Sequence, residues 1–144
     1  MKLGVDCVGI TVVFFCHDGN GNYLLSKRSK NCRDEQGTWD FGGGALEFGL
    51  TIEENLRKEL MEEYCTIPLK IEFLNYSDVL REQNNVKTHW LGMYFKVLID
   101  PQTVKIGEPH KVDELKWFKL NEFPKDLHSE VPKAIEKNKY KLYG

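Results

Sequence analysis

Residues 42–67 read GGGALEFGLTIEENLRKELMEEYCTI, a glycine-rich turn followed directly by an acidic helical segment. Three glycines in a row release the backbone into turns that larger residues resist. Thr51 can cap the helix, and Glu54 three residues later completes a capping box. We therefore predict a helix from this cap through about Glu63, preceded by backbone that can approach a phosphate or offer a carbonyl to a metal.

The predicted helix carries one acidic patch. Glu59, Glu62 and Glu63 stand at i, i+3 and i+4, so they project within roughly a 100° arc. Leu56 and Leu60 lie at the edge of this arc, which places the carboxylates at the seam between the buried face and solvent. One interpretation is a solvated helix face. The glycine turn directly before the helix favours the other interpretation, a site for a hard cation.

Strand-like segments lie on both sides of this stretch and indicate the fold class. They are 7–16 and 23–26, which flank the turn HDGNGN, then 38–41, 69–77, 87–99 and 115–120, and a closing helix is predicted over 132–138. Strands interleaved with one central and one terminal helix predict an α/β fold, an α/β/α sandwich with a central mixed sheet. Because one hydrophobic core commonly serves about 100 to 200 residues, residues 1–144 form one predicted domain.

Composition excludes several classes of function. The formal net charge is −2, so no global field favours a nucleic acid polymer or an anionic membrane. No run approaches the roughly 20 apolar residues that cross a bilayer, and the apolar N-terminal run is interpreted as a strand, so we expect a cytoplasmic protein. The four cysteines form no CxxC pair, which favours reduced, packed thiols. The four histidines are scattered and receive no role.

Residues 42–67 resemble the Nudix box, whose pattern is G-x5-E-x7-R-E-U-x-E-E-x-G-U with U an aliphatic residue. Gly44 matches the first glycine, and Glu59 matches the central glutamate. Glu62 and Glu63 match the paired glutamates. The resemblance, which covers about residues 8–124, implies that these glutamates and the Gly44 carbonyl hold Mg²⁺, with Mn²⁺ as the alternative ion. It also implies a Nudix-type fold.

Four positions depart from this pattern. They are Leu50 for the first glutamate, Lys58 for arginine, Cys65 for glycine and Thr66 for the aliphatic residue. Leu50 is the gravest change because it removes an acidic group and leaves the number of metal ions open. Lys58 keeps a positive charge without the planar fork of arginine. Glu47, in the loop before the helix, is either a replacement for the missing charge or an exposed loop residue.

The resemblance implies a pyrophosphohydrolase that cuts a phosphoanhydride bond in a nucleoside diphosphate linked to another moiety. A nucleoside triphosphate cut to monophosphate and pyrophosphate is one such reaction. The catalytic base would be one of the box glutamates or Glu108, whose alternative is an exposed turn residue. Arg28, Arg33 and Gly43 are the predicted substrate contacts, with a solvated loop as the alternative for both arginines.

The leading hypothesis is thus an enzyme, acting as a monomer or homodimer on a nucleotide or nucleotide derivative. The rival hypothesis is a non-catalytic Nudix-like module that binds a nucleotide or a protein, and Leu50 and Cys65 support it. We expect Trp39 and Trp117 to belong to the core rather than to stack on a base.

Overall fold

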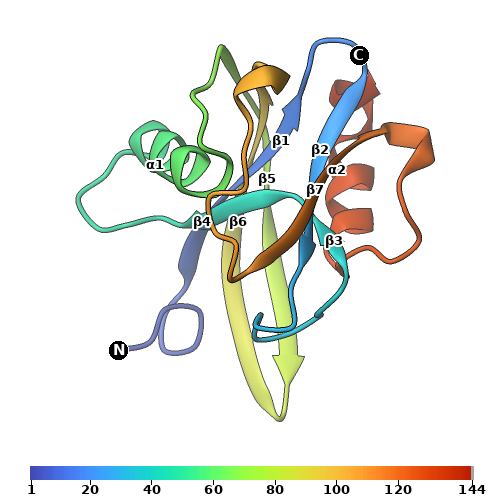
Figure 1. The fold of residues 1–144 in the computed structure, drawn as a ribbon. Coiled ribbons are helices and arrows are strands. Elements are labelled where there is room, and N and C mark those ends of the chain that lie inside the picture. Colours follow the sequence, from blue (N-terminus) through green and yellow to red (C-terminus); the bar gives the residue numbers. More distant parts are fainter. Residues whose placement is uncertain (144) are drawn as a thin grey trace.

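The computed structural model describes residues 1–143, and it places a seven-stranded sheet between two helices (Figure 1). The strands are β1 (Gly9–His17), β2 (Asn22–Arg28), β3 (Trp39–Asp40), β4 (Gly42–Ala45), β5 (Lys70–Gln83), β6 (Val86–Leu98) and β7 (Val112–Lys119). The α-helices are α1 (Ile52–Tyr64) and α2 (Val131–Tyr143), and the short 3-10 helices are Pro101–Thr103 and Leu120–Glu122. Among the described residues, no helix is long and apolar enough to cross a membrane.

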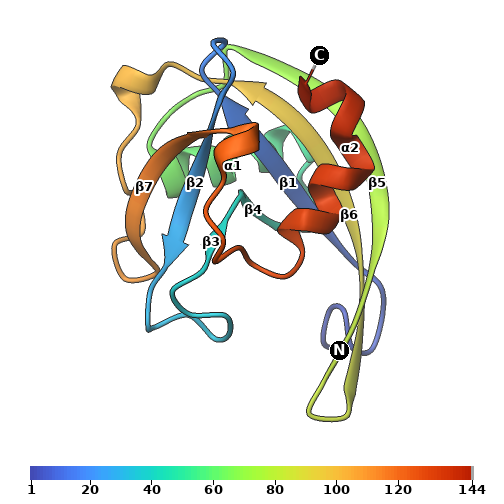
Figure 2. The same ribbon diagram turned by 90° about the vertical axis from the view of Figure 1, so that its right-hand side faces the viewer.

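The sheet is mixed, as predicted. Its order is β3-β2-β1-β6-β5, with β1 parallel to β6 and antiparallel to β2, while β4 pairs with β1 and β7 with β2. The two helices lie on opposite faces of this sheet (Figures 1 and 2). The α/β/α expectation is confirmed.

Alternation along β1 explains why both faces are covered. Val12, Phe14 and Cys16 contribute to the core cluster that includes Leu56 and Leu60 of α1. Phe15 belongs to the second cluster, which includes residues of α2. Successive side chains of a strand point to opposite faces, so an apolar run such as VVFFC is expected in a strand that is buried on both sides.

Local contacts fix the start and the end of α1. The Thr51 side chain accepts from the Glu54 backbone, and the Glu54 side chain accepts from the Thr51 backbone, so the predicted capping box is present. At the other end Cys65 adopts a left-handed conformation with φ of 56°, and its N–H donates to the Met61 carbonyl. Cys65 therefore occupies a left-handed position at the end of the helix, which glycine adopts at a lower conformational energy.

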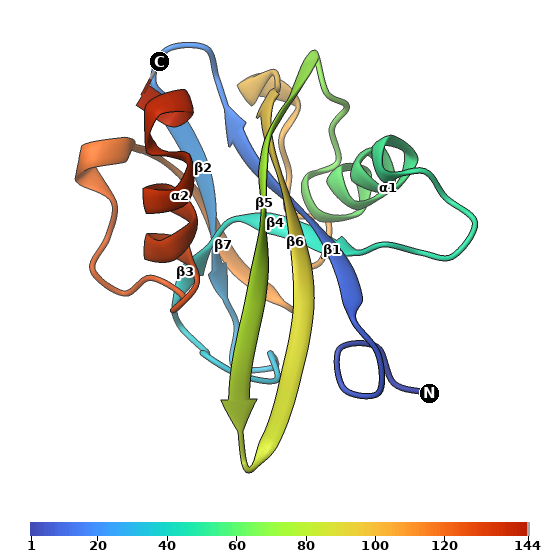
Figure 3. The same cartoon turned by 180° about the vertical axis from the view of Figure 1, so that it is seen from behind.

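Several predicted boundaries were too short. The strands β5 and β6 form a long hairpin that projects beyond the rest of the sheet (Figure 3). Its turn residues Asn84 and Asn85 both have positive φ, which asparagine tolerates better than most residues. The helix α2 runs five residues past the predicted end at 138, and β2 extends through Arg28, so the loop between β2 and β3 is 29–38.

The cysteines are free thiols, as expected, although they are not all packed. Cys16 is buried and Cys65 is exposed, while Cys7 and Cys32 are half-buried. The prediction of a packed thiol is thus wrong for Cys65, because the end of α1 lies at the surface. Trp39 and Trp117 are partly buried against the two core clusters, as expected.

Candidate functional site

One pocket of about 850 Å³ brings the predicted site residues together. Its lining includes all eight of them, namely Arg28, Arg33, Gly43, Gly44, Glu59, Glu62, Glu63 and Glu108. These residues come from the end of β2 and the loop after it, from β4, from α1 and from the loop before β7. The roles assigned to them remain predictions, whereas their common location is a property of the fold.

The strand β4 brings backbone against two of the carboxylates. The Gly43 N–H donates to Oε2 of Glu63 at 3.1 Å. A Cβ added at Gly44 would lie 2.6 Å from Oε2 of Glu59, which is closer than real Cβ contacts allow. With glycine at position 44 the Glu59 carboxylate lies directly against the chain, and a Cβ there would push this side chain aside. The buried Asn55 side chain binds the Ala45 carbonyl at 3.1 Å, which fixes β4 to α1.

The carboxylates of α1 lie in an unfavourable electrostatic environment. Burial raises the pKa of Glu63 well above 4.5, and the nearby charges of Glu59, Glu108 and Asp40 raise it further. Burial also raises the pKa of Glu59, and the Lys58 ammonium opposes that rise. Like charges held close together in a partly buried site repel one another unless a cation lies between them.

Lys58 neutralises part of this charge. Its Nζ lies 3.0 Å from Oε1 of Glu62, 3.5 Å from Oε1 of Glu59 and 3.9 Å from Oε2 of Glu47. The lysine therefore replaces the box arginine as a partner of the carboxylates. Glu47 is exposed, and its carboxylate lies near the other carboxylates only as a third partner of the Lys58 ammonium.

The loop before β7 is tied to the end of α1 and brings Glu108 to the pocket. The Lys105 N–H donates to the Tyr64 carbonyl at 3.0 Å, and the Gly107 N–H donates to the Glu63 carbonyl at 3.0 Å. Gly107 lies so close to the Glu62 carbonyl that no Cβ would fit. The charge of Glu108 raises the pKa of both Glu59 and Glu63. Glu108 thus lines the same pocket as the carboxylates of α1, and its role as a base stays a prediction.

The two predicted arginines differ in their surroundings. Nη2 of Arg28 donates to Oδ1 of Asp34 at 2.9 Å, and its Nε donates to the Asp34 carbonyl at 3.2 Å. Nη1 of Arg28 also lies 3.6 Å from Oδ2 of Asp40. Arg28 is therefore engaged within the protein. Arg33 lies on the pocket wall as well.

The profile of the NUDIX domain matches residues 8–138. The chain belongs to the NUDIX family. It is similar to the nucleoside triphosphatase NudI of Escherichia coli O139:H28, with 29% identity over an alignment of 135 positions that covers 88% of this chain and 92% of that protein.

Two solved structures share the NUDIX fold. A MutT NUDIX hydrolase from Burkholderia pseudomallei has a TM-score of 0.80 and 22% identity, covering 92% of this chain and 98% of the other. The NUDIX domain of Shewanella oneidensis NrtR, complexed with ADP ribose, has a TM-score of 0.70 and 20% identity, covering 99% of this chain and 90% of the other. The prediction of a NUDIX-type pyrophosphohydrolase is confirmed at the level of the family.

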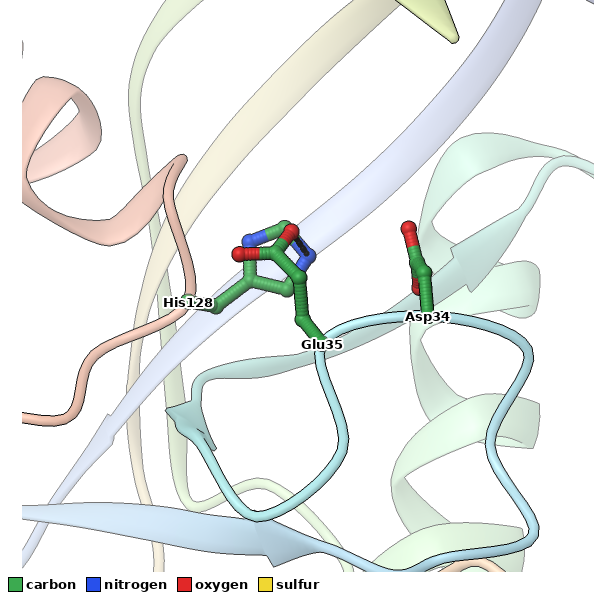
Figure 4. Close-up of side chains that lie close together, drawn as sticks. All are labelled: Asp34, Glu35 and His128. Carbon is green, nitrogen blue, oxygen red and sulfur yellow. Dashed lines mark ion pairs between the residues drawn. The ribbon is translucent and has the colours of Figure 1, made fainter. Parts of the chain in front are cut away.

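Sequence reasoning missed a further cluster of this NUDIX domain. His128 received no role, yet its Nε2 lies 2.8 Å from Oε2 of Glu35, with Asp34 beside them (Figure 4). Ligand atoms of these three residues all lie within 4.8 Å of one another, a spacing that a metal ion could bridge. No local pattern connects the 29–38 loop to the segment before α2, so only the fold reveals this cluster.

Proposed function

We propose that this NUDIX protein hydrolyses a phosphoanhydride bond of a nucleotide with Mg²⁺, and that it cuts a nucleoside triphosphate to monophosphate and pyrophosphate. One observation carries this proposal. Glu59, Glu62 and Glu63 line one pocket with the Gly44 backbone, and two of the three have raised pKa values. Such a set of oxygen ligands favours a hard divalent cation.

The donor set fits the metal that this family generally uses. The carboxylates would hold the ion together with the Gly44 carbonyl, and Mn²⁺ is the alternative ion. The close approach of the Glu59 carboxylate to the Gly44 backbone, which we call the Gly44 cradle, supports this assignment. A side chain at position 44 would displace that carboxylate. When bound, the ion neutralises phosphate oxygens and lowers the pKa of water.

The protein groups around the ion have separable tasks. The Gly43 N–H orients Glu63, and Lys58 orients Glu62 and Glu59 through its ion pairs. One of these glutamates or Glu108 would accept the proton of the attacking water. Arg33 is placed on the pocket wall where a guanidinium can bind a phosphate in two contacts.

The substrate class is supported by the comparisons. The Escherichia coli relative is named a nucleoside triphosphatase, and the NrtR domain was solved with ADP ribose, a nucleoside diphosphate linked to a sugar. A nucleoside triphosphate and ADP ribose are both nucleotides with a phosphoanhydride bond. We therefore propose a nucleotide of this class as the substrate. The assay below identifies its nucleobase and its leaving group.

The test is a turnover assay with the four deoxynucleoside triphosphates, ADP-ribose and nucleotide sugars in Mg²⁺. We expect turnover of at least one, and a fall in kcat of about 100-fold or more for Glu62→Gln. Glu53→Gln is the matched control, because Glu53 lies on the same helix, exposed and paired with Arg57 at 3.3 Å. Metal-independent nucleotide binding by folded wild-type protein without any product would instead establish the non-catalytic module.

A further inference from the structure

The 29–38 loop divides into residues that face the pocket and residues that do not. Asn31, Cys32 and Arg33 line the pocket. The next two residues, Asp34 and Glu35, are not part of its lining. Asp34 pairs with Arg28, which does line the pocket, and Glu35 pairs with Arg81 on β5. This division suggests that the second pair anchors the first three.

Glu35 contacts two other parts of the chain. Its Oε2 accepts from Nη2 of Arg81 on β5 at 3.1 Å and lies 2.8 Å from Nε2 of His128. Its Oε1 accepts from the Ser129 N–H at 2.8 Å, and Oε2 accepts from the Ser129 hydroxyl at 3.0 Å. We call Asp34, Glu35, Arg81, His128 and Ser129 the Glu35 cluster. Through it the loop is joined both to the projecting hairpin and to the segment before α2.

The backbone at Glu35 points to the same conclusion. Its φ is 46°, in the left-handed region that residues with a Cβ rarely adopt. A strained conformation of this kind persists when surrounding contacts fix it. The carboxylate contacts of Glu35 supply that constraint.

The Glu35 cluster is better explained as an anchor than as a metal site. Nη2 of Arg81 lies 3.1 Å from Glu35 and 3.5 Å from Asp34, so both carboxylates already face a guanidinium. Nδ1 of His128 accepts from the Glu130 N–H at 3.1 Å. Nε2 therefore carries the hydrogen that it donates to Glu35, and it has no lone pair for a cation.

The other end of the 29–38 loop is tied to the loop that carries Glu108. The Ser29 N–H donates to the Lys111 carbonyl at 2.9 Å, and the Ser29 hydroxyl donates to the His110 carbonyl at 2.6 Å. The Asn31 amide also donates to the His110 carbonyl, at 3.0 Å. The Cys32 thiol donates to the Lys111 carbonyl at 3.2 Å. The loop is thus attached on both sides of Arg33, through Ser29, Asn31 and Cys32 on one side and through Glu35 on the other.

We propose that Glu35 is a positioning residue for substrate, which holds Asn31, Cys32 and Arg33 against the pocket. The inference rests on the proposed function for the identity of the substrate, a nucleoside triphosphate. The position of the loop depends on contacts within the protein and not on which substrate binds. Glu35 does not line the pocket, so its loss weakens substrate binding without removing a group from the metal-binding carboxylates.

Amide hydrogen exchange tests the anchor without any assay of activity. We expect Glu35→Ala to increase exchange at residues 29–38 and leave α1 unchanged. Glu35→Gly is the matched variant, because glycine removes the carboxylate and accepts the positive φ without strain. Increased exchange in both variants supports the anchor. Unchanged exchange in both, or an increase in Glu35→Ala alone, overturns it.

Kinetics with the four deoxynucleoside triphosphates test the effect on substrate. We expect KM for the preferred one to rise about tenfold in both Glu35 variants while kcat changes less than about twofold. In a double-mutant cycle, Ser129→Ala should add little to Glu35→Ala. An unchanged KM overturns the proposal, and so does a kcat that falls by the same factor as kcat/KM. Wild-type protein inactive on every nucleotide would refute the proposed function, while exchange would still decide the anchor.

Discussion

Glu63→Gln is expected to stabilise the metal-free protein while it removes hydrolysis. Glutamine has nearly the volume of glutamate and keeps a side-chain oxygen. This oxygen can accept from the Gly43 N–H, as Oε2 of Glu63 does at 3.1 Å. What it removes is the charge that faces Glu59, Glu108 and Asp40. Burial is the largest cause, so with about 1 kcal/mol for burial and about 0.3 kcal/mol for each of the three repulsions, the gain in unfolding free energy is about 2 kcal/mol. For a chain of this size that is roughly 4 to 8 °C in Tm.

The gain should depend on pH in a direction that the structure fixes. The folded state raises the pKa of Glu63 above 4.5, so it binds the proton more tightly than the unfolded chain does. Wild-type stability from this group is therefore complete below pH 4.5 and is lost as pH rises through the folded-state pKa. The advantage of Glu63→Gln should be small at pH 4 and largest at pH 8.

Urea unfolding in a chelator, followed by circular dichroism, measures this difference. Glu62→Gln is the control, because its side chain is 46% exposed and paired with Lys58 at 3.0 Å. That variant should gain no stability. Mg²⁺ should stabilise wild type more than Glu63→Gln. A Glu63→Gln variant that is no more stable than wild type at pH 8, or that has the same advantage at pH 4, would show that the charge of Glu63 does not destabilise the fold.

Three further outcomes are expected. Gly44→Ala should weaken Mg²⁺ binding in calorimetry and lower kcat/KM about tenfold or more, because the new Cβ displaces the Glu59 carboxylate; unchanged affinity would exclude the cradle. Cys65→Gly should raise the unfolding free energy by about 1 kcal/mol with unchanged activity, because glycine accepts φ of 56° without strain; a loss of stability would contradict this. Arg33→Gln should raise KM for nucleoside triphosphates, whereas Arg57→Gln on the exposed side of α1 should not.

The parts of the site that lie within one helix could be predicted from sequence. The spacing of Glu59, Glu62 and Glu63 is local, and the capping box at Thr51 marks the start of α1. The structure adds what depends on long-range contacts. Glu108 reaches the pocket through backbone bonds to the end of α1.

The Glu35 cluster shows the limit most clearly. Glu35 and His128 are far apart in the chain, and neither belongs to a recognisable pattern. Arg28 lines the pocket and stays a predicted substrate contact, while its ion pairs with Asp34 and Asp40 could not be foreseen from sequence. By contrast, the long β5–β6 hairpin left a signal, because Asn84-Asn85 is a pair that suits a tight turn between strands.

The location of the divalent ion shows directly whether the carboxylates of α1 form the metal site. Crystals soaked with MnCl₂ and the α,β-methylene analogue of dATP would reveal Mn²⁺ by anomalous scattering. We expect the peak among the carboxylates of Glu59, Glu62 and Glu63, within coordination distance of the Gly44 carbonyl. A peak among Asp34, Glu35 and His128, with none at α1, would contradict the account.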